Sequence, residues 1–163
     1  MRNAVALSAL ASVIVFLSLA DGRGFAQSAQ PVLFPHVVHV TGYRIDCRFC
    51  HIYATRANSA GIPSAEKCKV CHRVIATGNP EVQKVIRASK ERKAIAWNRV
   101  AKLPDHVYFP HHKMVNAGVP CLFCHPGIDR ATTAVQKRAF TMGWCMACHR
   151  QRGVSIDCLT CHK

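Results

Sequence analysis

The chain has 163 residues, which is enough for one domain of ordinary size. Only 7% of its residues are aromatic, and no long periodic apolar stretch follows residue 26, so a core built from protein side chains alone would be thin. The formal charge of +14, taken by itself, would suggest nucleic acid or an acidic membrane surface as a partner.

Residues 1–26 have the pattern of a signal peptide. Arg2 supplies a positive start, residues 4–20 are almost wholly apolar, and Gly24-Phe25-Ala26 places small residues before a cleavage point at Gln27. The alternative is a retained anchor, although the apolar run is at the short limit for crossing a bilayer. Cleavage would leave residues 27–163 as one exported domain.

The cysteines predict the class of cofactor. All ten fall into five C-x-x-C pairs, and a histidine follows every pair. C-x-x-C-H is the attachment signal of c-type haem, in which two thiols bond one porphyrin edge and the histidine ligates the iron from the proximal side. We therefore expect five covalently bound haem c groups. The thioether positions are Cys47, Cys50, Cys68, Cys71, Cys121, Cys124, Cys145, Cys148, Cys158 and Cys161, and the proximal ligands are His51, His72, His125, His149 and His162.

Other uses of C-x-x-C fit less well. Structural zinc needs pairs of pairs, and five pairs cannot be divided evenly. Disulfides between such close cysteines would make small strained loops, and a thioredoxin-like motif needs a βαβ pattern that the chain lacks.

The cofactors also change the meaning of the charge. Residues 1–26 contribute +1, so residues 27–163 carry +13. Five haems bring ten propionates, which would reduce the net charge to about +3 if all were ionised. The basic excess is therefore predicted to compensate the cofactors, and nucleic acid is not expected as a partner.

An internal repeat orders the candidate distal ligands. Phe34-Pro35-His36-Val37-Val38-His39 precedes the first motif, and Phe109-Pro110-His111-His112-Lys113-Met114 precedes the third. His36 and His39 would share one helix face and reach two stacked haems. The predicted distal ligands are His36, His39, His106, His111 and Met114, with His112 as the alternative to Met114.

The choice between Met114 and His112 has a chemical consequence. Met114 stands where the first repeat has His39, and a His/Met-ligated haem has a higher potential than a bis-His haem. A methionine here could equally pack against a porphyrin without ligating it.

The repeat predicts the organisation of the domain. Two di-haem units, about 34–72 and 109–149, would be followed by a fifth haem at 158–162. Between the units, Asn79-Pro80-Glu81 is a helix start, and an amphipathic, basic linker helix is expected over about 80–96.

Three segments carry a resemblance to a known family. Ala60–Ser64 before the second motif, Leu103–Phe109, and Met142–Arg150 around the fourth motif resemble the pentahaem cytochrome subunit of alternative complex III, a bacterial quinol-oxidising membrane complex. The shorter F-x-H-x-x-H motif is shared with class III cytochromes c. The resemblance implies a mainly α fold with extensive coil, little or no β-sheet, and a core of stacked haems. Relatives usually have a second histidine where this chain has Met114.

The resemblance also implies a function. The chain would be a non-enzymatic, periplasmic relay, attached to the outer face of the inner membrane through its partner subunits. Electrons would come from an iron–sulfur protein or a quinol-oxidising membrane subunit and leave to a mono-haem cytochrome or an oxidase. The alternative is a free soluble shuttle. A multihaem reductase is less favoured, because it needs an iron with an open position and the chain offers a distal candidate for every iron.

Overall fold

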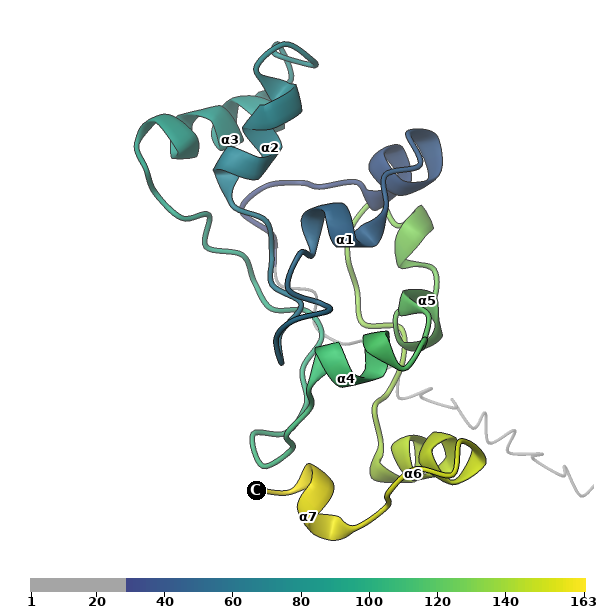
Figure 1. Ribbon diagram of the computed structural model, residues 1–163. Helices are drawn as coiled ribbons and strands as arrows, with labels where there is room; N and C mark the ends of the chain where they lie inside the picture. Colours follow the sequence, from purple (N-terminus) through teal and green to yellow (C-terminus); the bar gives the residue numbers. More distant parts are fainter. Residues whose placement is uncertain (1–28) are drawn as a thin grey trace, which may run out of the picture.

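The computed structural model describes residues 29–163, so the predicted signal peptide lies outside the described residues. The fold consists of short helices joined by long coil segments (Figure 1). In chain order the elements are η1 (Val37–Gly42), α1 (Cys47–Cys50), α2 (Ala65–His72), α3 (Pro80–Lys90), α4 (His111–Asn116), α5 (Cys121–Cys124), η2 (Ile128–Arg130), α6 (Met142–Gln151) and α7 (Cys158–Cys161). Residues 29–163 contain no β-strand, and their one isolated β-bridge joins Val107 to His162. The expected mainly α fold with coil is confirmed.

Each cysteine pair lies on a helical turn, and side-chain caps begin several of these turns. Asp46 accepts a hydrogen bond from the Arg48 N–H at the start of α1, and Asp157 accepts one from Leu159 at the start of α7. Thr141 accepts one from Trp144 at the start of α6. Because residues three apart lie on one side of a helical turn, both thiols of each pair face the same way.

The linker helix begins where the sequence predicts but is shorter. Asn79 caps α3 by accepting the Glu81 N–H, and Pro80 is the first helical residue. The helix ends at Lys90 rather than near residue 96. Arg92 has a left-handed backbone (φ 51°), and the Lys93 N–H bonds the Ala88 carbonyl while the Arg92 N–H bonds that of Ser89. This is a Schellman termination, made here without the usual glycine.

The buried protein core is small. Val32, Ala65 and Val85 form one cluster where α2 packs on α3, and Cys68 and Trp97 pack against it. Large apolar side chains elsewhere are exposed, including several inside or beside the cysteine motifs: Phe49, Val70, Val74, Leu122, Phe123 and Leu159. The polypeptide alone does not bury the apolar surface that a domain of this length needs.

Backbone and side-chain contacts join distant segments into one body. The His111 and His112 N–H groups bond the carbonyls of Asn58 and Ala57, which places α4 beside the segment after α1. In the same way η1 contacts η2, since the Val37 N–H bonds the Ala131 carbonyl and the Thr41 hydroxyl bonds that of Asp129. Figure 1 shows α2 and α3 at one end and α6 and α7 at the other. Among residues 29–163 there is no helix with the length and apolarity needed to cross a membrane.

Candidate haem-binding sites

None of the ten cysteines of the five motifs forms a disulfide in residues 29–163. Burial is the largest cause that raises the pKa of five of them, and repulsion from another cysteine adds to it, although Lys67 acts in the opposite direction at Cys50: Cys47, Cys50, Cys68, Cys124 and Cys145. These cysteines lie close enough to thiols of other motifs for charge repulsion to contribute to the rise in their pKa.

The imidazoles of four proximal histidines are oriented by backbone carbonyl groups. His51 Nδ1 lies 2.6 Å from the Gly61 carbonyl oxygen, His72 Nδ1 3.1 Å from that of Ile75, and His149 Nδ1 2.8 Å from that of Ser155. His162 Nδ1 makes a longer contact, 3.4 Å, with the His106 carbonyl oxygen. A carbonyl oxygen can only accept, so Nδ1 carries the proton and Nε2 is left as the metal ligand.

Two predicted distal histidines are oriented in the same manner. His39 Nδ1 lies 3.0 Å from the Pro35 carbonyl oxygen, and His111 Nδ1 lies 2.7 Å from that of Asn58. Their Nε2 atoms are therefore also available to a metal. These carbonyl acceptors cannot be predicted from the sequence, because every residue has a backbone oxygen and no residue type marks the one that is used.

Two pairs of imidazoles lie close together, at or somewhat below the separation that an iron between them would require. The ring centres of His39 and His72 are 6.1 Å apart, with the planes at 66°. Those of His106 and His162 are 5.4 Å apart, with the planes at 23°. Two metal–nitrogen bonds of roughly 2 Å, plus the distance from each nitrogen to its ring centre, give a separation of about 6 Å. These residues fit an iron held from both sides.

Two further pairs are brought together less closely. The pKa of His36 is lowered to about 4, mainly by burial and then by repulsion from His51 and His39. Burial likewise lowers the pKa of His125, with repulsion from His111 and then His51 as the next causes. His36 thus lies near the first proximal histidine, and His111 near the third.

The two repeats have matching geometry at their first histidine. The Phe34 and His36 ring centres are 4.9 Å apart with planes at 90°, and those of Phe109 and His111 are 4.9 Å apart with planes at 85°. The register that aligns His36 with His111 therefore aligns His39 with Met114.

Met114 and His112, the two candidates for the remaining distal ligand, both lie on α4. Both side chains are half-buried on α4, and the Nδ1 atom of His112 is buried without a hydrogen-bond partner. No measured contact pairs His149 with either residue.

The apolar side chains beside the motifs fit a flat apolar prosthetic group. Phe49, Leu122 and Phe123 lie between paired cysteines and keep 43–45% of their surface exposed. Side chains of this kind are normally buried, and a porphyrin bonded to the adjacent thiols would cover them.

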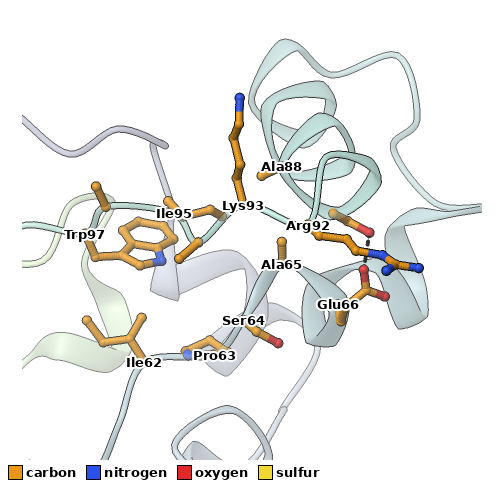
Figure 2. A pocket seen from close by; sticks show the side chains of 13 residues that line it. Ile62, Pro63, Ser64, Ala65, Glu66, Ala88, Arg92, Lys93, Ile95 and Trp97 are labelled. Carbon is orange, nitrogen blue, oxygen red and sulfur yellow. Dashed lines mark hydrogen bonds between the residues drawn. The ribbon is translucent and has the colours of Figure 1, made fainter.

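A cavity of about 670 Å³ lies beside the second motif (Figure 2). Residues from the start of α2, the end of α3 and segment 92–97 line it, and none of them is a cysteine or histidine. Glu66 accepts a hydrogen bond from the Ser89 hydroxyl across its wall, and Arg92 lies near the same carboxylate. The cavity therefore borders the second attachment site and is separate from its ligands.

Five C-x-x-C-H turns on a helical chain with a small buried core are what is expected of a multihaem c-type cytochrome. No family model matches the chain. The chain is 29% identical, over 167 aligned residues, to the multiheme cytochrome c subunit of menaquinone reductase from Nitratidesulfovibrio vulgaris strain Hildenborough. The alignment covers 85% of this chain and 79% of that relative.

Proposed function

We propose that this protein is an exported pentahaem cytochrome that relays electrons as a subunit of a quinone-linked membrane complex. Two lines support the assignment: the resemblance to the cytochrome subunit of alternative complex III, and the similarity to a cytochrome subunit of a menaquinone reductase. The direction of flow differs between these two systems, so the proposal covers relay between a membrane quinone module and other redox subunits. An iron–sulfur protein and a mono-haem cytochrome or an oxidase are the expected partners, with peripheral attachment to the membrane through them.

The facing imidazoles of His39 and His72 are the observation that carries the proposal. Haem iron, when bound, supplies reversible one-electron chemistry. The protein's part is to hold each iron from both sides, which leaves no open position for a substrate. We assign His39 opposite His72, His106 opposite His162, His36 opposite His51, and His111 opposite His125. Met114 or His112 would complete the fourth site opposite His149.

Haem content and ligation test the proposal directly. Protein produced with its maturation machinery should carry the added mass of five haems and show only low-spin spectra. The His39→Ala variant should convert one haem in five to a high-spin form that binds carbon monoxide. Val38→Ala, on the same helical turn and already 44% exposed, is the matched control and should stay fully low-spin. Fewer than five haems, or carbon monoxide binding by much of the wild-type haem, would contradict the assignment.

Co-purification tests whether the protein is a subunit of a membrane complex. A subunit should co-purify from membranes with iron–sulfur and membrane-spanning partners. A free shuttle would instead be recovered alone in the soluble exported fraction.

A further inference from the structure

We propose that the five attachment motifs form one unbranched row in the order second, first, third, fourth, fifth, so that the two ends of the relay are the motifs on α2 and α7. This inference rests on the proposed function. It adds that two particular motifs, those at the ends of the row, exchange electrons with partner subunits. The order differs from the order along the chain, because the first motif is placed inside the row.

The second and first motifs are neighbours through α1, α2 and η1. The Lys67 ammonium group, one residue before the second motif, lies 3.8 Å from the centre of the Phe49 ring inside the first motif. The turn η1 carries His39 toward His72, and its N-cap residue is His36, the ligand assigned above to the first motif. A single helical turn therefore serves both motifs.

The first and third motifs meet where the two di-haem units join. Cys47 and Cys121 are close enough for mutual repulsion to raise the pKa of Cys47, after the larger effect of burial. Backbone bonds hold α4 against residues 57 and 58, and the Asn116 amide bonds the Thr55 carbonyl at 3.1 Å. These contacts place the distal His111 next to the segment that follows the first motif.

The third and fourth motifs contact each other through aromatic rings. Phe123, inside the third motif, stacks on Trp144, the residue before the fourth, with ring centres 5.4 Å apart and planes at 29°. Phe140 packs edge-on against both Trp144 and His125.

The fourth and fifth motifs are linked by Ser155. Its carbonyl oxygen accepts the His149 Nδ1–H at 2.8 Å, and its hydroxyl lies 3.1 Å from that of Thr160 inside the fifth motif.

The two end positions are also the most open. Among residues 29–163, no hydrogen bond, ion pair or ring contact joins 65–75 to 121–163. Val70 in the second motif is 55% exposed and Leu159 in the fifth is 74% exposed, against 43–45% for the apolar residues within the first and third motifs. Figure 1 shows α2 and α7 at opposite ends of the molecule, with α1 and α5 between them. Partner subunits would therefore exchange electrons at α2 and at α7.

Proton NMR of the fully reduced, diamagnetic wild-type protein tests the order. Each haem is assigned to its motif from contacts between its thioether groups and the cysteine β-protons. Haem-to-haem nuclear Overhauser effects should connect four pairs only: second–first, first–third, third–fourth and fourth–fifth. Cross-peaks between second and third or between second and fifth, or none between first and third, would overturn the order.

Removing one end motif gives a second measurement. The variant C158A/C161A/H162A should lose one haem by mass and only the contacts of the fifth haem with the fourth. The variant C68A/C71A/H72A should lose one haem and only the contacts between the second haem and the first. A loss that extends to other pairs in both variants would contradict the row. A wild-type protein with fewer than five haems would refute the proposed function, whereas five haems with another contact network would refute only the order.

Discussion

His51 Nδ1 lies 2.6 Å from the carbonyl oxygen of Gly61, so a glycine ten residues beyond the first motif sets the orientation of its proximal ligand. Gly61 has φ +72°, and a Cβ added there would lie 2.8 Å from the Tyr53 ring. Both the conformation and the contact require glycine at this position.

We therefore expect Gly61→Ala to move the carbonyl and alter one haem. The backbone cost alone is about 1 kcal/mol, and the clash with Tyr53 adds to it. Thermal unfolding should report the loss, and redox titration should show one of the five potentials shifted. Gly118→Ala is the matched control, because Gly118 has φ +78° and nothing within 4 Å of the added Cβ. It should lower stability without moving a potential, and equal shifts in both variants would refute the orienting role.

Met114 and His112 make opposite spectroscopic predictions for the fourth iron. If Met114 ligates, the oxidised protein has a near-infrared methionine-to-iron charge-transfer band and one haem of distinctly higher potential. Met114→Leu should then abolish the band while His112→Asn leaves it in place. Five bis-His signatures in the wild type, with a new high-spin haem in His112→Asn, would instead assign the site to His112.

The N-cap of α3 should contribute measurable stability. Asn79 Oδ1 accepts the Glu81 N–H at 2.8 Å, so Asn79→Ala should destabilise the protein by about 1 kcal/mol. Ser64 is the matched control, since it occupies the N-cap of α2 without a side-chain capping bond. Denaturant unfolding should show a clear loss for Asn79→Ala and little for Ser64→Ala. Equal losses would contradict the capping role.

The contacts of Glu81 predict a specific pH dependence of the stability of the folded protein. Its carboxylate pairs with Lys84 at 2.7 Å and accepts the Leu33 N–H at 2.8 Å, and these contacts hold its pKa below the usual 4.5. Because the folded pKa is the lower one, the stabilisation is present above pH 4.5 and is lost as the pH falls through the folded value.

The Glu81→Gln variant isolates this contribution. Denaturation midpoints of wild type and variant should differ at neutral pH and converge as the pH falls below 4.5. A difference that stays constant across this range would show that the charge of Glu81 is not responsible.

Local sequence was sufficient to predict a feature wherever the chemistry behind that feature involves only a few neighbouring residues. The five C-x-x-C-H motifs identify the class of protein because thioether attachment and proximal ligation need residues within one helical turn. The start of α3 was predictable for the same reason, since Asn79 and Pro80 act on the turn that they begin. The end of α3 was not predictable, because Arg92 takes a left-handed backbone conformation that an arginine side chain does not favour.

Only the tertiary structure decided which imidazoles face each other and how the motifs adjoin. His106 reaches His162 across 56 residues because the strand-like contact of Val107 with His162 holds the two segments together. The contact between Cys47 and Cys121 likewise depends on α4 packing against residues 57 and 58. Such proximities arise from packing and hydrogen bonds between segments far apart in the chain, and no local spacing of residue types encodes them.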